Sequence, residues 1–457
     1  MMGMEAAKRY FGEKMFNQLF SYLKNNPLNN LDRLYEISNK APLMPDHKEK
    51  ARKIKEAIDQ NPAIREYVEK IFNNVDENVQ QHLLVNFFIN SSVVGIPRQR
   101  KLSDELGFNI PFTILVDPTS NCNLKCKGCW AGEYEKHHQL EFEEMDRLVQ
   151  EAKELGIYFI VMSGGEPMMW PHLFDLCEKH KDVAFMLYTN GTLIDQEKAR
   201  KMRDAGNITP AISVEGGREA TDNRRGNGVF DKIMLAMDNL RENGVIFGFS
   251  ITITRDNYQE AFSEEFIDLM IEKGCLYGWS FHYIPIGRNP DFSLMITPEE
   301  RASLVNRVIE IRNNKPIQIA DFWNDGNLTQ GCIAGGRRYF HINASGEVEP
   351  CAFVHFAIDN IRNKPLKEIL DNPLFKAYQK RQPFSHNLLR PCPIIDNPEE
   401  LREIVEESRA YPSHPGADDI IKEPNARKLD EIAENWRQEA DKKWEEVYEV
   451  KKAESAN

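Results

Sequence analysis

The sequence predicts an α/β protein built on an open, partial (β/α)6 barrel, with helices before the barrel and a small irregular region and a helix after it. From about residue 112, short apolar runs alternate with amphipathic stretches, a pattern typical of parallel strands joined by helical crossovers. Gly156, Gly206, Gly244 and Gly274 each follow such a stretch, as glycine commonly follows a helix. Six units are too few for a closed eight-fold barrel, so the barrel is expected to be partial.

The composition argues against nucleic-acid-binding, secreted and membrane-spanning proteins. The formal net charge of -13 over 457 residues disfavours a general nucleic-acid-binding surface. The N-terminal stretch MMGMEAAKRYFGEKMF carries charges within its apolar part, so no secretory signal is expected, and no apolar run is long enough for a spanning helix. We therefore expect a cytoplasmic protein and leave peripheral membrane contact open. In the cytoplasm thiols stay reduced, so the eight cysteines are expected to be metal ligands, catalytic groups or core residues.

The first segment, residues 1–105, is predicted to be helical. Two sets of apolar residues are spaced four apart, as on one face of a helix: Phe11, Met15, Leu19 and Leu23, then Ile71, Val75, Val79 and Leu83. Structural packing is the expected role of this segment, and a substrate lid is the alternative.

The second segment, residues 106–316, is predicted to form the barrel. Its expected strands are FTILVD, YFIVMSG, VAFMLYTNG, ITPAISVEG, IFGFSITIT and YGWSFHYIP. Its expected helices span 141–156, 171–180, 195–206, 229–244, 258–274 and 297–315. Because ligands of parallel α/β proteins bind at the carboxyl ends of the strands, the polar loops that follow the first four strands are the candidate site.

The remainder divides into two further segments. Residues 317–398 resemble short hairpins, with a turn at Asn343–Gly346, and form the third predicted domain. Residues 399–457 are charged and helical, with an apolar stripe expected to dock on the body: Leu429, Ile432, Trp436 and Ala440.

Three cysteines lie close together in DPTSNCNLKCKGCWAGEY, after the first predicted strand: Cys122, Cys126 and Cys129. Three thiols are one too few for a closed structural zinc site and cannot all pair as disulfides. An iron–sulfur cube held by three thiolates would leave one iron open to a substrate or cofactor. A zinc knuckle or a chance group of buried thiols is the alternative.

The Cys-x3-Cys-x2-Cys loop resembles the signature of the radical S-adenosylmethionine (SAM) enzymes. The loop after the second strand agrees, because it matches the family's GGEP motif: Gly164, Gly165, Glu166 and Pro167. The resemblance implies a 4Fe–4S cluster whose open iron binds SAM. It also implies reductive cleavage of SAM to a 5′-deoxyadenosyl radical, which takes hydrogen from an unactivated C–H bond.

The resemblance implies further SAM contacts. Asn190 of TNGT would shape the pocket, Ser213 and Glu215 of SVEG would contact the ribose and carboxylate, and Arg225 would hold the methionine carboxylate. A solvated surface charge is the alternative for Arg225. No catalytic side chain is expected beyond the cluster-bound SAM. The family's aromatic residue before the third cysteine is replaced by Gly128, and Trp130 is the candidate substitute near adenine.

A second set of cysteines resembles the auxiliary-cluster region called SPASM or, when shortened, Twitch: Cys332, Cys351 and Cys392. This resemblance implies a second 4Fe–4S cluster with three thiolates. Its fourth iron would be open or capped, with His341 and His355 as candidates. Zinc or structural thiols remain the alternative. Cys177 and Cys275 are expected to be core residues.

The predicted function is therefore that of a radical SAM enzyme acting on an unknown small molecule, lipid or peptide. The second cluster would assist substrate binding or electron transfer, and reduced ferredoxin or flavodoxin would donate electrons. The alternative is a non-catalytic iron–sulfur or zinc protein that serves electron transfer or scaffolding.

Overall fold

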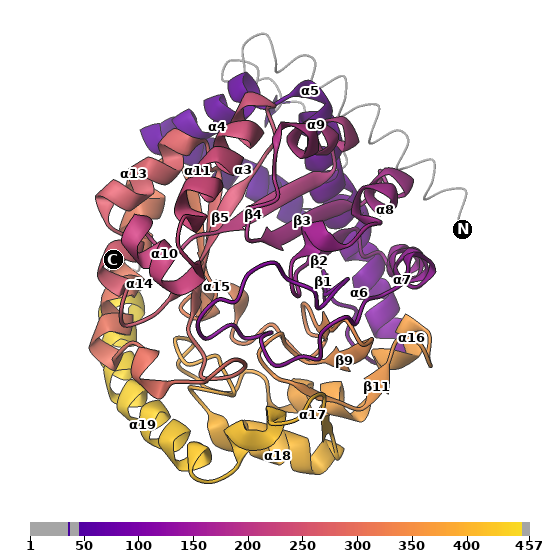
Figure 1. Cartoon of the computed structure of the whole chain (residues 1–457), viewed down its shortest axis with the longest axis vertical. Coiled ribbons are helices and arrows are strands. Elements are labelled where there is room, and N and C mark those ends of the chain that lie inside the picture. The colour runs from indigo at the N-terminus through magenta and orange to yellow at the C-terminus, as the bar shows by residue number, and fades with distance from the viewer. Residues whose placement is uncertain (1–34, 37–44, 450–457) are drawn as a thin grey trace.

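The centre of the fold is a ten-stranded sheet, seen in a computed structural model that describes residues 35, 36 and 45–449 (Figure 1). The strand order is β11-β9-β8-β1-β2-β3-β4-β5-β6-β7, and β1 to β7 run parallel. These seven strands are β1 (Ile114–Val116), β2 (Phe159–Met162), β3 (Ala184–Thr189), β4 (Ile208–Ser213), β5 (Gly248–Ile253), β6 (Tyr277–His282) and β7 (Gln318–Asp321). The first six confirm the predicted strands, and β7 adds a seventh at the edge.

The crossover helices largely follow the prediction. They are α7 (Phe142–Glu154), α8 (Leu173–Lys179), α9 (Gln196–Ala205), α11 (Val229–Glu242) and α14 (Pro298–Asn314). The helix expected at 258–274 is two helices, α12 (Tyr258–Ala261) and α13 (Glu264–Lys273), because the Ser263 side chain caps α13 by accepting from the Phe266 amide. A further helix, α10 (Arg218–Arg225), was not predicted.

Helices from the N-terminal part cover the amino ends of the strands. They are α3 (Pro45–Gln60), α4 (Pro62–Asn74), α5 (Glu77–Val79), the π-helix η1 (Gln80–Gly95) and α6 (Ile96–Leu106). The predicted single face through Ile71 and Leu83 is wrong as one helix, because α4 ends at Asn74 and Asp76 caps α5. Its four residues nevertheless pack in one cluster with Ala184 and Ile246. The predicted face that begins at Phe11 lies outside the described residues.

The predicted hairpin extends the barrel sheet. Strand β8 (His341–Ile342) pairs parallel with β1, and the chain returns through a turn at Gly346, whose φ is +83°, into β9 (Glu347–Glu349). The other short elements are η2 (Pro167–Met169), η3 (Phe292–Leu294), α15 (Gly326–Thr329), β10 (Phe356–Ala357), β11 (Asp359–Asn360), α16 (Leu366–Ile369), α17 (Pro373–Arg381), β12 (Tyr411–Pro412) and η4 (Ala417–Ile421).

The C-terminal helices close the other side of the molecule (yellow in Figure 1): α18 (Pro398–Ser408), α19 (Asn425–Trp444) and η5 (Glu445–Glu449). Of the predicted apolar stripe on α19, Leu429, Trp436 and Ala440 are buried and Ile432 is half-buried, and α19 packs against α14. Within the described part of the chain, no helix combines the length and the apolar character needed to cross a bilayer.

Candidate active site

A cavity of about 770 Å³ occupies the barrel and reaches both ends of its strands. Ala184 and Tyr277 line it at the amino ends, and Ser213 and His282 line it at the carboxyl ends. The three cysteines of the first loop also line it. The carboxyl end of this cavity is therefore the candidate active site.

The first cysteine loop is held by backbone contacts from distant segments. The Arg288 amide donates to the Cys129 carbonyl over 3.0 Å, and the Lys127 amide donates to the Arg224 carbonyl over 2.9 Å. The loop brings its thiols together: Cys126 and Cys129 lie close enough for their charges to raise the pKa of Cys122. Burial raises the pKa of Cys122 to about 11. At neutral pH this thiol therefore holds its proton until a cation binds and displaces it.

Backbone amides at the sulfur distinguish five of the six candidate ligands from the core cysteines. Cys122 Sγ accepts from the Leu124 amide and Cys392 Sγ from the Ile394 amide, both over 3.4 Å. Amides two residues ahead also lower the pKa of three further thiols, against the stronger effect of burial: Cys129, Cys332 and Cys351. Cys177 and Cys275 have no such amide among the described residues. Amides aimed at sulfur stabilise thiolate ligands, so this pattern fits a metal-bound state.

The second set of cysteines surrounds Tyr378. Burial raises the pKa of its hydroxyl well above the usual range, and the charges of all three cysteines add to this effect. The buried Tyr378 hydroxyl has no hydrogen-bond partner within the described residues, whereas Tyr339 donates its hydroxyl to Cys351 Sγ over 2.8 Å. An unpartnered donor among three thiols fits a cluster, whose sulfide atoms accept hydrogen bonds.

A single metal ion fits these cysteines less well than a cluster does. Across residues 35, 36 and 45–449, no three His, Cys, Asp or Glu side chains are arranged to hold one ion. Zinc needs its ligands to converge at about 2.0–2.3 Å from one point. In an iron–sulfur cube each thiolate binds its own iron, so the sulfurs need not converge.

Neither histidine proposed as a capping ligand offers a ring nitrogen to iron. His341 is buried, with Nε2 3.0 Å from Asp117 Oδ2 and Nδ1 2.6 Å from Glu349 Oε2. His355 Nδ1 lies 2.7 Å from His414 Nε2, and its Nε2 lies 2.9 Å from the Ala352 carbonyl. Both rings are therefore committed to protein partners.

The position of His341 between two carboxylates predicts a pH-dependent stability. Burial lowers its pKa, but Asp117 and Glu349 outweigh burial and raise the pKa to about 10. Because the folded pKa exceeds the usual value of about 6.5, the stabilisation is complete below pH ~6.5 and is lost as pH rises through about 10. We expect the free energy of unfolding of the wild type, relative to His341→Gln, to fall across this range in urea titrations. The exposed His386→Gln should show no such trend, and a constant difference for His341→Gln would contradict the assignment.

Most of the predicted SAM contacts line the cavity: Trp130, Gly164, Gly165, Asn190, Ser213 and Arg225. A Cβ on Gly165 would lie 2.1 Å from the Asn121 carbonyl oxygen, so this loop can take its path only with glycine there. Glu166, Pro167 and Glu215 lie outside the lining.

The carboxylates of Glu166 and Glu215 do not line the cavity, but they bind residues that do. Glu166 accepts from the Thr189 hydroxyl over 2.6 Å and the Asn190 amide over 2.7 Å, which joins the loops after β2 and β3. Glu215 Oε1 lies 2.5 Å from both Arg224 Nη1 and Arg225 Nη2. The Arg225 side chain is buried, so it is not a solvated surface charge.

The aromatic ring that packs against the first cysteine loop comes from Tyr283, which sequence reasoning missed. Gly128 has φ +59°, and a Cβ there would lie 2.6 Å from Tyr283 Cε2. Tyr283 follows β6 and also lines the cavity. Trp130 packs edge-on against His341 and Tyr134. The local motif contains no signal for Tyr283, because only the fold brings β6 beside the loop.

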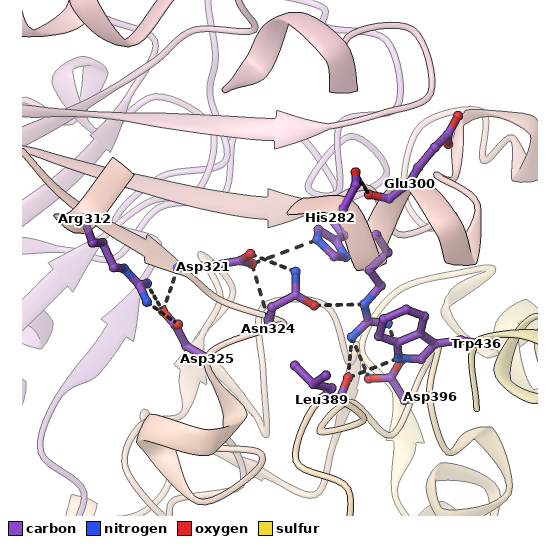
Figure 2. A network of polar contacts seen from close by, with 11 residues as sticks. His282, Glu300, Arg312, Asp321, Asn324, Asp325, Leu389, Asp396 and Trp436 are labelled. Carbon is purple, nitrogen blue, oxygen red and sulfur yellow. Dashed lines mark hydrogen bonds and ion pairs between the residues drawn. The ribbon is translucent and has the colours of Figure 1, made fainter. Parts of the chain in front are cut away.

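Sequence reasoning also missed a buried acid–base pair at the carboxyl end of the cavity (Figure 2). His282 stacks on Trp323, and burial holds its pKa well below the usual range. Neither ring nitrogen makes a hydrogen bond within the described part of the chain, although Nε2 lies 4.0 Å from Asp321 Oδ1. Burial raises the pKa of Asp321 to about 6. Only His282 lines the cavity, with Asp321 behind it, so His282 is the group that can exchange a proton with a bound molecule.

The pair connects to the second cysteine set through Arg301. Asn324 donates to Asp321 over 2.8 Å and accepts from Arg301 Nε over 3.2 Å. Arg301 Nη1 lies 2.5 Å from Asp396 Oδ1, and Asp396 Oδ2 accepts from the Cys392 amide over 3.0 Å. The network therefore fixes the barrel and the loop of Cys392 relative to one another.

Two family models match the chain. Residues 116–267 match the radical SAM superfamily, and residues 332–393 match an iron–sulfur cluster-binding domain, SPASM. The two matched ranges contain both cysteine sets. Together they imply SAM and more than one iron–sulfur cluster as cofactors.

Similar proteins with assigned names include enzymes of different kinds. An AdoMet-dependent heme synthase of Methanosarcina barkeri is 26% identical over 294 residues, which cover 58% of this chain and 83% of that protein. The mycofactocin maturase MftC of Mycolicibacterium smegmatis is 26% identical over 278 residues, or 58% of this chain and 69% of that protein. SuiB of Streptococcus suis, crystallised with S-adenosylmethionine, superposes with a TM-score of 0.54 at 17% identity, over 65% of this chain and 75% of that one, which supports the fold.

Proposed function

We propose that this chain, which belongs to the radical SAM superfamily and carries a SPASM domain, reductively cleaves SAM and takes hydrogen from an unactivated C–H bond of a substrate in the barrel cavity. One observation carries this proposal: a single cavity is lined by all three cysteines of the first loop and extends far beyond them. When bound, the cluster and SAM supply a 5′-deoxyadenosyl radical.

Within this proposal the chain's own residues hold the reactants. Cys122, Cys126 and Cys129 bind the cluster at three irons. Arg225, fixed by Glu215, offers its remaining guanidinium donors to a carboxylate, and Gly165 allows a ligand close to the backbone. Tyr283 offers a ring face for adenine. The largely apolar lining of the cavity would limit the water beside the reacting carbon.

We assign Cys332, Cys351 and Cys392 to a second cluster that assists substrate binding or electron transfer. His282, which burial keeps neutral and whose ring nitrogens make no hydrogen bond to any described residue, is placed to accept a proton if the substrate also gives up an electron. Reduced ferredoxin or flavodoxin is the proposed electron donor. The relatives named above are a heme synthase and a mycofactocin maturase, whose names indicate unlike reactions, so neither activity carries over to this chain.

The runner-up is a non-catalytic iron–sulfur protein. The cavity argues against it, since an electron carrier needs no space of about 770 Å³ beside its cluster. The deciding experiment is anaerobic reconstitution with iron and sulfide, followed by dithionite and SAM. We expect chromatography to detect 5′-deoxyadenosine. If protein fully loaded with iron and sulfide forms none, the proposed enzymatic function is refuted.

The second cysteine set is expected to act separately from the first. Replacing Cys332, Cys351 and Cys392 by Ala should lower the iron content by about four atoms per chain and leave SAM cleavage in place. Cys275→Ala, a core cysteine without an amide at its sulfur, is the matched control and should keep all iron. An unchanged iron content in the triple variant would rule out the second cluster.

A further inference from the structure

The barrel is hollow because small side chains occupy inward positions on its strands. Lining residues on β3, β4, β5 and β7 include Ala184, Thr209, Ser213, Ser250 and Ala320. In closed barrels these layers are filled by bulky branched side chains. The open space follows the strands, and six residues of strand span about 20 Å. The cavity is thus long enough for an extended molecule.

The amino end of the cavity has an apolar floor. Leu83, Leu84 and Phe87 of η1 line it there, together with Tyr67 of α4. The Thr209 and Tyr277 hydroxyls do not offer free polar groups, because they lie 2.8 Å apart and also bond to the carbonyls of Ile246 and Pro210. A bound molecule with its own amides or hydroxyls would lose hydrogen bonds to water here. A hydrocarbon would lose none.

Apart from the Arg224–Arg225–Glu215 group, which we assign to SAM, the charged groups of the cavity leave one cation available. No Asp, Glu or Lys side chain is among its lining residues, and Arg224 and Arg225 pair with Glu215. The third arginine, Arg338, is exposed and makes no hydrogen bond or ion pair through its side chain with any residue described. Its carbonyl accepts from the Phe112 amide, which places it at the amino end of β1, opposite the cysteine loop.

We propose that the cavity binds a long-chain fatty acyl group, with its anionic end on Arg338 and its chain directed through the barrel toward the cysteine loop. The inference rests on the proposed function, because the attacked C–H bond would belong to this chain. A peptide would bury amides without partners, and a ring with several carboxylates would meet only one unpaired arginine. A single anion on a flexible hydrocarbon matches both the apolar walls and the one free cation.

Equilibrium dialysis of the cluster-loaded protein with labelled fatty acids, from octanoate to palmitate, tests the proposal. Each buried methylene should tighten binding by about 4-fold, until the chain reaches the far end of the cavity. Affinity that does not depend on chain length would overturn the inference. Competition by palmitoyl lysophosphatidylglycerol would support a lipid-bound acyl chain, and its failure to compete would support the free acid.

Two variants test separately the binding of the carboxylate and the binding of the hydrocarbon of the fatty acid. Arg338→Gln should lower the affinity for every fatty acid by the same factor. It should leave the affinity for hexadecanol unchanged, because hexadecanol has no carboxylate. Ala184→Leu narrows the barrel and should abolish the dependence on chain length, whereas Val93→Leu, on the exposed side of η1, should keep it. If circular dichroism shows both variants folded, and Ala184→Leu and Val93→Leu show the same dependence of affinity on acyl-chain length, the proposal is contradicted. Formation of 5′-deoxyadenosine without length-dependent binding would refute this inference alone, and binding without cleavage would refute only the proposed function.

Discussion

Replacing Cys122, Cys126 and Cys129 by Ala is expected to abolish 5′-deoxyadenosine formation from SAM and dithionite. Without these thiolates no ligand set holds a cluster at the carboxyl end of the cavity, and SAM has no iron to bind. The iron content should fall by about four atoms per chain. Chromatography of the products and iron analysis of the reconstituted protein measure the two effects.

The matched control for these replacements is Cys177→Ala. This thiol is fully buried in α8, with burial as the main cause of its raised pKa and no amide aimed at its sulfur. The variant should keep its iron and its SAM cleavage, although it loses some core packing. Cleavage that survives in the triple variant would contradict our assignment of the first loop.

Replacing Arg301 by Leu is expected to lower the free energy of unfolding by about 3–5 kcal/mol. The side chains of Arg301 and Asp396 are 5% and 0% exposed, so the substitution leaves a buried carboxylate without its cation. It also removes the guanidinium that lies over the Trp436 ring and donates to the Leu389 carbonyl. Urea titration of the protein, followed by circular dichroism, measures the loss.

Two further variants test the cause of this loss. Arg437→Leu removes an exposed arginine of α19 that pairs with Glu434 and should barely change the unfolding midpoint. Arg301→Met combined with Asp396→Leu should recover much of the stability, because no unpaired charge stays buried. A double variant as unstable as Arg301→Leu would show that packing around Trp436, and not the charge, causes the loss.

Much of the fold could be predicted because its signals are local. The six predicted strands are short stretches rich in apolar residues, and several crossover helices carry their own capping residue or a glycine at the C-terminal end. Strand β7 was not predicted because only two of its four residues, Ile319 and Ala320, are apolar. The π-helix η1 was not predicted because it has no amphipathic face. The break between α12 and α13 depends on one serine cap.

The sequence by itself predicted the chemistry that we propose for the two cysteine sets, because ligand type and spacing can be read along the chain. Only the tertiary structure decided what surrounds them. Tyr283 reaches the cysteine loop from β6, His282 meets Asp321 from the next strand, and Arg338 reaches the far rim of the cavity. These contacts depend on strand order and register, and side chains such as Ala184 and Ala320 leave the barrel open only because the pleat turns them inward.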